Sequence, residues 1–321
     1  MKMKIILGAA MLFSSMSFAA IKKDDFSIYK SHPVLVAVID TGCDTQHPDL
    51  KKFIWTNLGE TGKDKFGNDK ENNEIDDDGN GFTDDVHGWN FVNNNNDVSD
   101  LVGHGTHVSG IIKNEFLRHT STGISKNNSL QIMVLKYFNP KAKQDENLKN
   151  STKAIEYANK MQARIINYSG GGSDSYLNEL IAIKQSEKQK IVFVAAAGNN
   201  QTDTDIEKYY PASYPLSNII SVAASNNSGD LVAFSNFGKS IDIAAPGKLI
   251  YSTLPKKSYG IMSGTSQAAA YVSGMVASLY GNNQTLRKPQ VILQELIRIG
   301  KMNATLQGKI KSQIALLQNE N

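Results

Sequence analysis

The sequence predicts an α/β protein, a three-layer sandwich in which helices cover both faces of a mainly parallel central sheet. Short, continuously apolar runs rich in Val and Ile recur along the chain. Continuous rather than alternating apolarity is typical of strands that are buried on both faces, as in a parallel sheet. Segments with helical spacing of apolar residues separate these runs. Such an alternation of strands and helices favours an α/β sandwich.

The strands and helices follow one another in chain order. We expect strands at five apolar runs that are too short for helices: Val34–Ile39, Leu130–Leu135, Arg164–Ile166, Ile191–Ala196 and Ile219–Ala223. We expect helices at five segments with helical spacing: Gly105–Leu117, Thr152–Gln162, Tyr176–Lys188, Ser266–Tyr280 and Pro289–Ile299. In such sheets ligands bind beyond the carboxyl ends of the strands, so functional residues are expected there.

The stretch between residues 60 and 100 has a different character. It holds twelve Asp and Glu residues against three lysines, and Asn and Gly make up much of the rest. Such a composition cannot fold by burying apolar surface. We therefore expect a long surface excursion between a strand and a helix.

Composition and charge exclude several classes of protein. With 321 residues, 40% hydrophobic and 20% charged, the chain is neither disordered nor collagen-like and can bury a substantial core. The formal charge of +3 falls to about +1 without Lys2 and Lys4, so no attraction to nucleic acid or to an acidic membrane is expected. Cys43 is the single cysteine, so no intramolecular disulfide can form. We expect it to be a small buried filler; the alternative is a thiol near the active site.

The first residues have the pattern of a signal peptide. Lys2 and Lys4 precede an apolar stretch that ends in small residues, with cleavage expected near Ala19. A transmembrane anchor is the alternative, but the apolar stretch is too short to cross ~30 Å of hydrocarbon comfortably. We expect a signal peptide at 1–19, a short segment at 20–32 and one domain at 33–321. The mature protein is expected to be secreted or periplasmic, with no membrane anchor after cleavage.

Two motifs carry a carboxylate and an imidazole. The run Val36–Gly42 ends a buried strand in Asp40 and so places a carboxylate at the carboxyl edge of the sheet; a turn or capping Asp is the alternative. In Gly-His-Gly-Thr-His at 103–107, flanking glycines permit close approach to His104, which suits a base that must reach a substrate. Metal ligation by His104 and His107 is the alternative, but the motif lacks the Glu that commonly accompanies such a pair. We interpret His107 as structural.

The third motif, Gly-Thr-Ser at 264–266, opens an Ala-rich helix. The hydroxyl and peptide N–H of Ser266 then lie at the positive end of the helix dipole; a simple N-cap is the alternative. Asn199 follows an apolar run and can donate its side-chain amide to an oxyanion, although Gly-Asn also suits a turn. Asp40, His104 and Ser266 occur in the chain order of the subtilisin triad.

Taken together, the motifs give the sequence its resemblance to the subtilisin-like serine peptidases, the subtilase family. Six blocks match that family in order and spacing: Ile39–Gly42, His47–Leu50, His104–Val108, Ala195–Asn199, Ala245–Gly247 and Gly264–Ser266. The similarity covers about residues 33–317. It implies the subtilisin-like form of the three-layer sandwich.

The resemblance also implies roles for the matched residues. Ser266 would be the nucleophile, and His104 would take its proton and later give it to the leaving amine. Asp40 would hold the imidazole in the right tautomer and stabilise the imidazolium. The side chain of Asn199 and the peptide N–H of Ser266 would bind the developing oxyanion.

The segment Asn167–Gly172 aligns with the substrate-binding strand of the family. A polypeptide substrate would add antiparallel to Ser169, Gly170 and Gly171 through main-chain hydrogen bonds, so side-chain pockets must supply most of the selectivity. The family usually has a larger residue at Gly170. We therefore expect this glycine to widen the first pocket, which receives the substrate side chain next to the scissile bond. We expect Tyr209 to narrow the far end of that pocket.

Part of the acidic stretch fits the first half of a calcium loop. Asp76, Asp78, Asn80 and Asp84 take positions 1, 3, 5 and 9 of the loop, with glycine at position 6. Position 12 is histidine instead of the bidentate Glu, so an EF-hand is not supported. Three adjacent carboxylates repel one another unless a cation offsets them, so we expect a structural calcium ion here. A solvated turn is the alternative.

These features predict an exported serine endopeptidase that hydrolyses polypeptides through an acyl-enzyme and acts as a monomer. Peptide ligation or cyclisation on the same triad is one alternative, because Ala270 stands where the family commonly has proline. A catalytically silent peptide-binding protein is another. Against it, all four catalytic positions hold competent residues.

Overall fold

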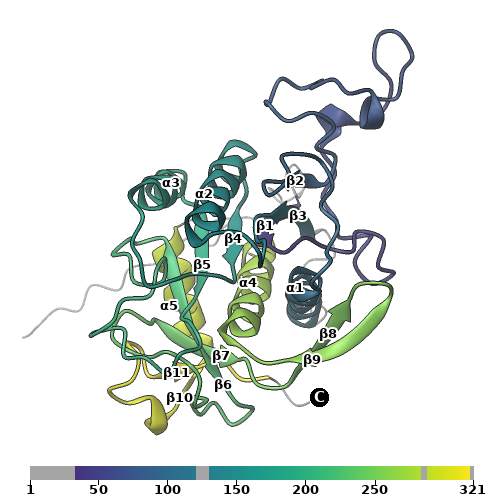
Figure 1. Ribbon diagram of the computed structural model, residues 1–321. Coiled ribbons are helices and arrows are strands. Elements are labelled where there is room, and N and C mark those ends of the chain that lie inside the picture. Colours follow the sequence, from purple (N-terminus) through teal and green to yellow (C-terminus); the bar gives the residue numbers. More distant parts are fainter. Residues whose placement is uncertain (1–32, 121–129, 283–287, 319–321) are drawn as a thin grey trace, which may run out of the picture. The chain divides into compact units, whose positions relative to one another are not determined.

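The expected apolar runs form adjacent parallel strands at the centre of one sheet. These are β6 (Ile219–Ser225), β5 (Val192–Ala196), β4 (Ile165–Tyr168), β1 (Val34–Asp40) and β3 (Leu130–Lys136), in that spatial order. Four short strands complete the sheet: β2 (Gly88–Asn90), β7 (Ile243–Pro246), β10 (Lys301–Met302) and β11 (Ile314–Ala315). Within the described residues the order is β10-β11-β7-β6-β5-β4-β1-β3-β2, and only the β10–β11 pair is antiparallel (Figure 1).

Helices cover both faces of this sheet. The helices are α1 (His104–Thr120), α2 (Gln144–Lys160), α3 (Leu177–Lys188), α4 (Thr265–Asn282) and α5 (Pro289–Ile299). Apolar side chains of α1, α4 and α5 share one core cluster, whereas those of α2 and α3 belong to a second. Figure 1 shows α2 and α3 together on one side of the sheet.

Alternation along β1 shows how one strand serves both clusters. Val36 and Val38 pack in the core beneath α1 and α4, whereas Ala37 and Ile39 pack in the core beneath α2. Successive side chains of a strand point to opposite faces, so a strand that is apolar at every position is buried on both sides. The structure confirms the expected three-layer α/β sandwich with a mainly parallel sheet.

The boundaries of several elements differ from expectation. Helix α5 matches the expected range, but α2 begins eight residues before the expected Thr152. The hairpin of β8 (Ile250–Leu254) and β9 (Ser258–Met262) was not anticipated. It forms a separate two-stranded sheet with exposed side chains such as Tyr251 and Ile261, so no continuous apolar run marks it.

The excursion between residues 60 and 100 is exposed only in part. Its first half holds short 3-10 helices at Leu58–Glu60 and Lys70–Asn72, and forms the blue segment that extends beyond the sheet in Figure 1. Its second half contains the edge strand β2, with Trp89 and Phe91 buried against the core. The expected surface excursion between a strand and a helix is thus anchored by two aromatic residues in its second half.

Cys43 is buried in a small apolar cluster with Leu50, Ile54, Val98 and Val134. Burial raises the pKa of its thiol to about 12. A thiol with so high a pKa is almost entirely protonated at neutral pH and is a poor nucleophile. This position agrees with the expected role as a buried filler.

The computed structural model describes residues 33–120, 130–282 and 288–318. The expected signal peptide at 1–19 and the segment at 20–32 lie outside the described residues. Among the residues that are described, none of the helices has the length and apolar character needed to cross a membrane.

Candidate active site

A carboxylate and an imidazole meet at the carboxyl edge of the sheet. Asp40 is the last residue of β1 and is 4% exposed, and His104 is the first residue of α1. Nδ1 of His104 lies 2.7 Å from Oδ1 of Asp40, which also accepts the peptide N–H of Thr41 at 2.8 Å. An ionised carboxylate can only accept, so Nδ1 carries the proton and Nε2 presents its lone pair.

The environment of His104 favours its protonated form. Burial works against the charged ring, but the charge of Asp40, the hydrogen bond to Asp40 and the charge of Asp100 outweigh it. The pKa of His104 is therefore raised above its usual value. A histidine shifted in this direction binds a proton readily once a nucleophile offers one.

The carboxylate of Asp100 fixes the start of α1. Its Oδ1 accepts the peptide N–H groups of Val102 and Gly103, and its Oδ2 accepts the N–H of Thr106 at 2.9 Å. These are donors at a helix N-terminus, where no intrahelical acceptor exists and negative charge is stabilising. Gly105 must lack a side chain, because a Cβ there would lie 2.1 Å from the carbonyl oxygen of Gly42. Together these contacts hold His104 against the end of β1.

The hydroxyl of Ser266 lies at the start of α4, on the same edge of the sheet. Ser266 is 7% exposed, and its Oγ donates to the carbonyl oxygen of Ser169 at 2.9 Å. Tyr168 pairs with Ile39 in the parallel register of β4 and β1, so Ser169 and Asp40 follow neighbouring strand positions. Neighbouring strands lie about 4.8 Å apart. The hydroxyl of Ser266 therefore lies at the same edge of the sheet as the Asp40–His104 pair.

Within the described part of the chain, the hydroxyl of Ser266 makes its hydrogen bond to Ser169 and makes none to His104. In substrate-free enzymes, catalytic hydrogen bonds are often formed only when substrate enters. Rotation about one side-chain bond changes the acceptor of a serine hydroxyl.

Asn199 is oriented by its neighbour Thr265. Its Oδ1 accepts the peptide N–H of Thr265 at 2.8 Å and the Thr265 hydroxyl at 3.1 Å. Among the described residues its Nδ2 has no hydrogen-bonding acceptor, so both amide hydrogens remain available beside Ser266. The peptide N–H of Ser266 belongs to the first turn of α4, where backbone donors have no intrahelical partner. The two groups form a pair of donors suited to an anionic oxygen.

The segment after β4 bonds to Tyr210 through Gly172 alone among residues 169–172. Gly172 exchanges both of its peptide hydrogen bonds with Tyr210, at 2.9 and 2.7 Å. The peptide groups of Gly171 make no hydrogen bond to Tyr210. No described residue bonds to them. The peptide groups of Gly171 are thus free to bond to an added chain.

The first pocket differs from expectation on one side. A Cβ on Gly170 would lie 2.1 Å from the hydroxyl oxygen of Tyr137. Tyr137 therefore takes the space that Gly170 was expected to leave open for the substrate, and that expectation was wrong. On the other side, a Cβ on Gly171 or on Gly198 would come within 3.0 Å of the Tyr209 ring. The ring lies between these two segments.

A buried polar network supports the segment after β4. Asn167 is fully buried, and its Nδ2 donates to the hydroxyl of Ser169 at 2.9 Å. The Ser169 hydroxyl donates to the carbonyl oxygen of Ser266, and the Ser273 hydroxyl donates to Oδ1 of Asn167. The network thus connects β4 with α4. Sequence reasoning missed Ser273, because its role depends on the packing of that helix.

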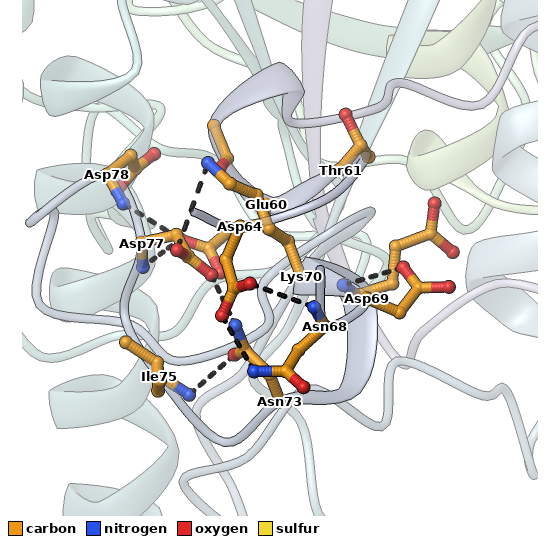
Figure 2. A network of polar contacts seen from close by, with 12 residues as sticks. Glu60, Thr61, Asp64, Asn68, Asp69, Lys70, Asn73, Ile75, Asp77 and Asp78 are labelled. Carbon is orange, nitrogen blue, oxygen red and sulfur yellow. Dashed lines mark hydrogen bonds and ion pairs between the residues drawn. The ribbon is translucent and has the colours of Figure 1, made fainter. Parts of the chain in front are cut away.

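A separate acidic cluster lies in the excursion. Glu60, Asp78 and Asp85 offer carboxylate oxygens within 4.8 Å of one another. Glu60 also accepts the peptide N–H groups of Asp77 and Asp78, at 2.9 and 3.1 Å, as Figure 2 shows. Burial, followed by charge repulsion within the cluster, raises the pKa of Glu60 and of Asp85. Hydrogen bonds from Asp77, Asp78, Asn57 and Asn80 oppose these shifts.

The structure brings one of the four expected metal ligands, Asp78, into this cluster. Asp76 instead accepts the peptide N–H groups of Asn80 and Gly81. The side-chain oxygen of Asn80 accepts the N–H of Phe82, so its amide nitrogen faces the carboxylates. Asp84 accepts an N–H through Oδ2, while its buried Oδ1 has no partner among the described residues. Glu60 and Asp85 were not predicted, because their approach is made only by the fold.

The likeness to known proteins extends over most of the chain. The model of the subtilase family matches residues 31–311. The chain belongs to the subtilase family. This family of serine peptidases was the one expected from the motifs.

The subtilase is similar to several characterised proteases. It is 36% identical over 250 residues to the major intracellular serine protease of Bacillus subtilis, covering 77% of this chain and 68% of that protein. It is 35% identical to the thermophilic serine proteinase of a Bacillus species, covering 76% of this chain and 51% of that protein. For subtilisin-like protease 2 of Plasmodium falciparum the identity is 33%, and the match covers 78% of this chain but 17% of that protein.

Solved structures show the same fold. A cold-adapted subtilisin-like serine proteinase superposes with a TM-score of 0.64 at 23% identity, covering 94% of this chain and 95% of that one. A lanthipeptide protease superposes with a TM-score of 0.63 at 21% identity, covering 88% and 84% of the two chains. At these identities the likeness concerns the fold of the subtilase.

Proposed function

We propose that this subtilase is a secreted serine endopeptidase in which Asp40, His104 and Ser266 form the catalytic triad. The observation that carries the proposal is the 2.7 Å hydrogen bond between Nδ1 of His104 and Oδ1 of Asp40, at the sheet edge where the hydroxyl of Ser266 donates to Ser169. Reaction through an acyl-enzyme is what such a set of groups is suited to perform.

The proposed catalytic steps use the lone pair on Nε2 of His104 and the unpaired hydrogen-bond donors near Ser266. Nε2 of His104 takes the proton of the Ser266 hydroxyl while Oγ attacks the scissile carbonyl carbon. Asp40 keeps the proton on Nδ1 and stabilises the imidazolium that forms. Nδ2 of Asn199 and the peptide N–H of Ser266 donate to the carbonyl oxygen as it becomes negative. His104 then protonates the leaving amine, and a water molecule releases the acyl group by the same steps.

The substrate would bind as an added strand. An extended polypeptide running antiparallel to Ser169–Gly171 finds the free peptide groups of Gly171, and its acyl carbon lies beside Oγ of Ser266. Main-chain hydrogen bonds of this kind bind any extended sequence, so the side chains that line the strand must select among substrates. The protein is proposed to act as a monomer on polypeptides.

We also propose a structural calcium ion near Glu60, Asp78 and Asp85. Carboxylate oxygens are the ligands that calcium prefers, at 2.3–2.6 Å, and three of them already lie within 4.8 Å of one another. The unpaired buried Oδ1 of Asp84 is a further oxygen in the same segment. An ion there would offset the mutual repulsion of these carboxylates and tie the excursion to the core. Export is proposed from the pattern of residues 1–19.

Labelling by a fluorophosphonate probe tests the triad. The wild-type protein should react, and Ser266→Ala should not. Ser263→Ala is the matched control, because this nearby exposed serine accepts a hydrogen bond from Leu249 and should leave labelling intact. Labelling that persists in Ser266→Ala contradicts the assignment. Cleavage of a peptide library in the presence of an added amine then gives the ratio of hydrolysis to ligation.

A further inference from the structure

A cavity of about 200 Å³ lies beyond the end of the substrate strand. Gly171 and Gly172 form part of its wall, together with the aromatic side chains of Tyr137, Tyr168 and Tyr210. The cavity also reaches Glu179 of α3. A side chain of a bound peptide can therefore enter it directly from the substrate strand.

Glu179 is an unusual residue to find at such a place. It is 1% exposed, and its Oε2 has no hydrogen-bond partner among the described residues. Burial raises the pKa of its carboxyl to about 7, although a hydrogen bond with Tyr214 opposes the shift. Nearly all buried polar groups in proteins are hydrogen-bonded, so an unpaired carboxylate oxygen indicates that a partner is missing.

The lining of the cavity favours a positively charged partner. Asp174 adds a second acidic residue, and no Lys or Arg occurs in the part of the lining that the structure describes. The rings of Tyr137 and Tyr168 lie 5.4 Å apart between their centroids. Ring faces attract cations, and the apolar stem of a lysine packs well against aromatic rings. An ammonium group also supplies the donors that an unpaired carboxylate oxygen lacks.

The strand geometry gives the position of this partner along the substrate. The residue that supplies the acyl group lies beside Ser169, because the Ser169 carbonyl accepts the hydroxyl of Ser266. In an antiparallel pair, each step toward the substrate N-terminus is one step from Ser169 toward Gly172. The third residue before the scissile bond then lies opposite Gly171, and the fourth lies opposite Gly172.

We propose that the cavity binds a basic side chain at the fourth residue before the scissile bond, with the carboxyl group of Glu179 as the group that receives it. The substrates of this site are therefore polypeptides with Lys or Arg at that position. The inference rests on the proposed function for the direction in which the substrate lies. The cavity and the unpaired carboxylate do not depend on it.

The test uses alanine-rich fluorogenic peptides that carry either lysine or the uncharged norleucine at each of the second to fifth positions before the scissile bond. In the wild-type protein, kcat/KM should be at least about tenfold higher for lysine than for norleucine at the fourth position, a difference of ~1.4 kcal/mol. The ratio should stay near one at the other positions. In Glu179→Gln the ratio at the fourth position should fall to near one. Glu156→Gln, an exposed acidic residue of α2, is the control and should retain the full ratio.

A second measurement separates the cavity from catalysis. Fluorescence anisotropy of the same peptides with Ser266→Ala reports binding alone, and the lysine peptide should bind more tightly. Binding with this preference but without cleavage by the wild-type protein supports the cavity and refutes the proposed function. Cleavage at equal rates for lysine and norleucine, or a maximum at another position, overturns the inference while the proposed function stands.

Discussion

The hydroxyl of Thr41 donates to Oδ1 of Asp100 at 2.9 Å and accepts the peptide N–H of Gly105 at the same distance. Thr41 follows Asp40, and Gly105 follows His104. The bonds therefore join the end of β1 to the start of α1 immediately behind the carboxylate–imidazole pair. Oδ2 of Asp100 holds the helix from the other side through the N–H and hydroxyl of Thr106.

Asp100→Asn should therefore lower activity although residue 100 touches no substrate. The amide cannot accept all the hydrogen bonds that the carboxylate accepts, and the loss of buried bonds of this kind costs about 1–3 kcal/mol of stability. We expect kcat to fall by about tenfold, because small displacements of catalytic groups are costly. The charge of Asp100 also contributes to raising the pKa of His104, so the midpoint of the kcat/KM–pH profile should move to lower pH.

Asp145→Asn is the control for that experiment. It removes a largely exposed carboxylate on α2, whose ion pair with Lys149 lies at the surface. Its pH profile should match that of the wild-type protein. An Asp100→Asn protein with reduced stability but an unshifted profile would show that Asp100 has a purely structural role.

The pH dependence of the wild-type protein follows from His104. The base must be unprotonated to accept the serine proton, and its pKa is raised above the ordinary value of 6.5. We therefore expect kcat/KM to increase with pH, with a midpoint above 6.5. The stabilising interaction with Asp40 has the opposite sign: it is complete below the unfolded-state pKa and is lost as pH rises through the folded-state pKa. Titration of the His104 ring by NMR, with Asp40→Asn giving a lower midpoint, checks the cause.

The sequence predicts the central sheet well because its strands are apolar at every position. Val34–Ile39 is buried on both faces whatever the details of packing, so its pattern depends little on the rest of the chain. Motif order also sufficed to select Asp40 and His104, 64 residues apart. The distance between the two side chains comes from the structure, because spacing along the sequence does not determine it.

The parts that sequence reasoning missed depend on tertiary contacts between polar residues. Glu60 lies in a stretch whose composition indicates solvent exposure, yet it is fully buried, because peptide N–H groups from a later part of the chain bond to its carboxylate. Glu179 belongs to a helix with the spacing of an ordinary surface helix. Its burial comes from the residues around the cavity, which are distant in sequence.

Tyr209→Ala tests whether the tyrosine ring limits the first substrate side chain. The ring contacts the positions of Gly171 and Gly198 on both sides, so its removal should open space between these two segments. We expect kcat/KM for a peptide with phenylalanine before the scissile bond to rise by about tenfold relative to one with alanine. Tyr251→Ala, on the exposed hairpin, should leave that ratio unchanged. An equal ratio in the wild-type protein and Tyr209→Ala would contradict the assigned contact.

Calcium binding can be measured without any substrate. Calcium at about 100 times its Kd would add ~2.7 kcal/mol to the stability of the folded state. After treatment with a chelator, added calcium should therefore raise Tm by about 5 °C. Asp85→Asn should abolish this increase, because it removes one of the three clustered carboxylates.

Asp76→Asn distinguishes the two possible ligand sets. If the ion lies among Glu60, Asp78 and Asp85, the Tm of this variant falls, because the turn formed with Asn80 and Gly81 is weakened. The increase in Tm on addition of calcium should nevertheless remain, since Asp76 is outside the cluster. Loss of the calcium response in Asp76→Asn, with retention in Asp85→Asn, would instead place the ion in the loop that the sequence pattern indicates. Magnesium at equal concentration should give a smaller increase, because it requires a tighter octahedral arrangement and dehydrates reluctantly.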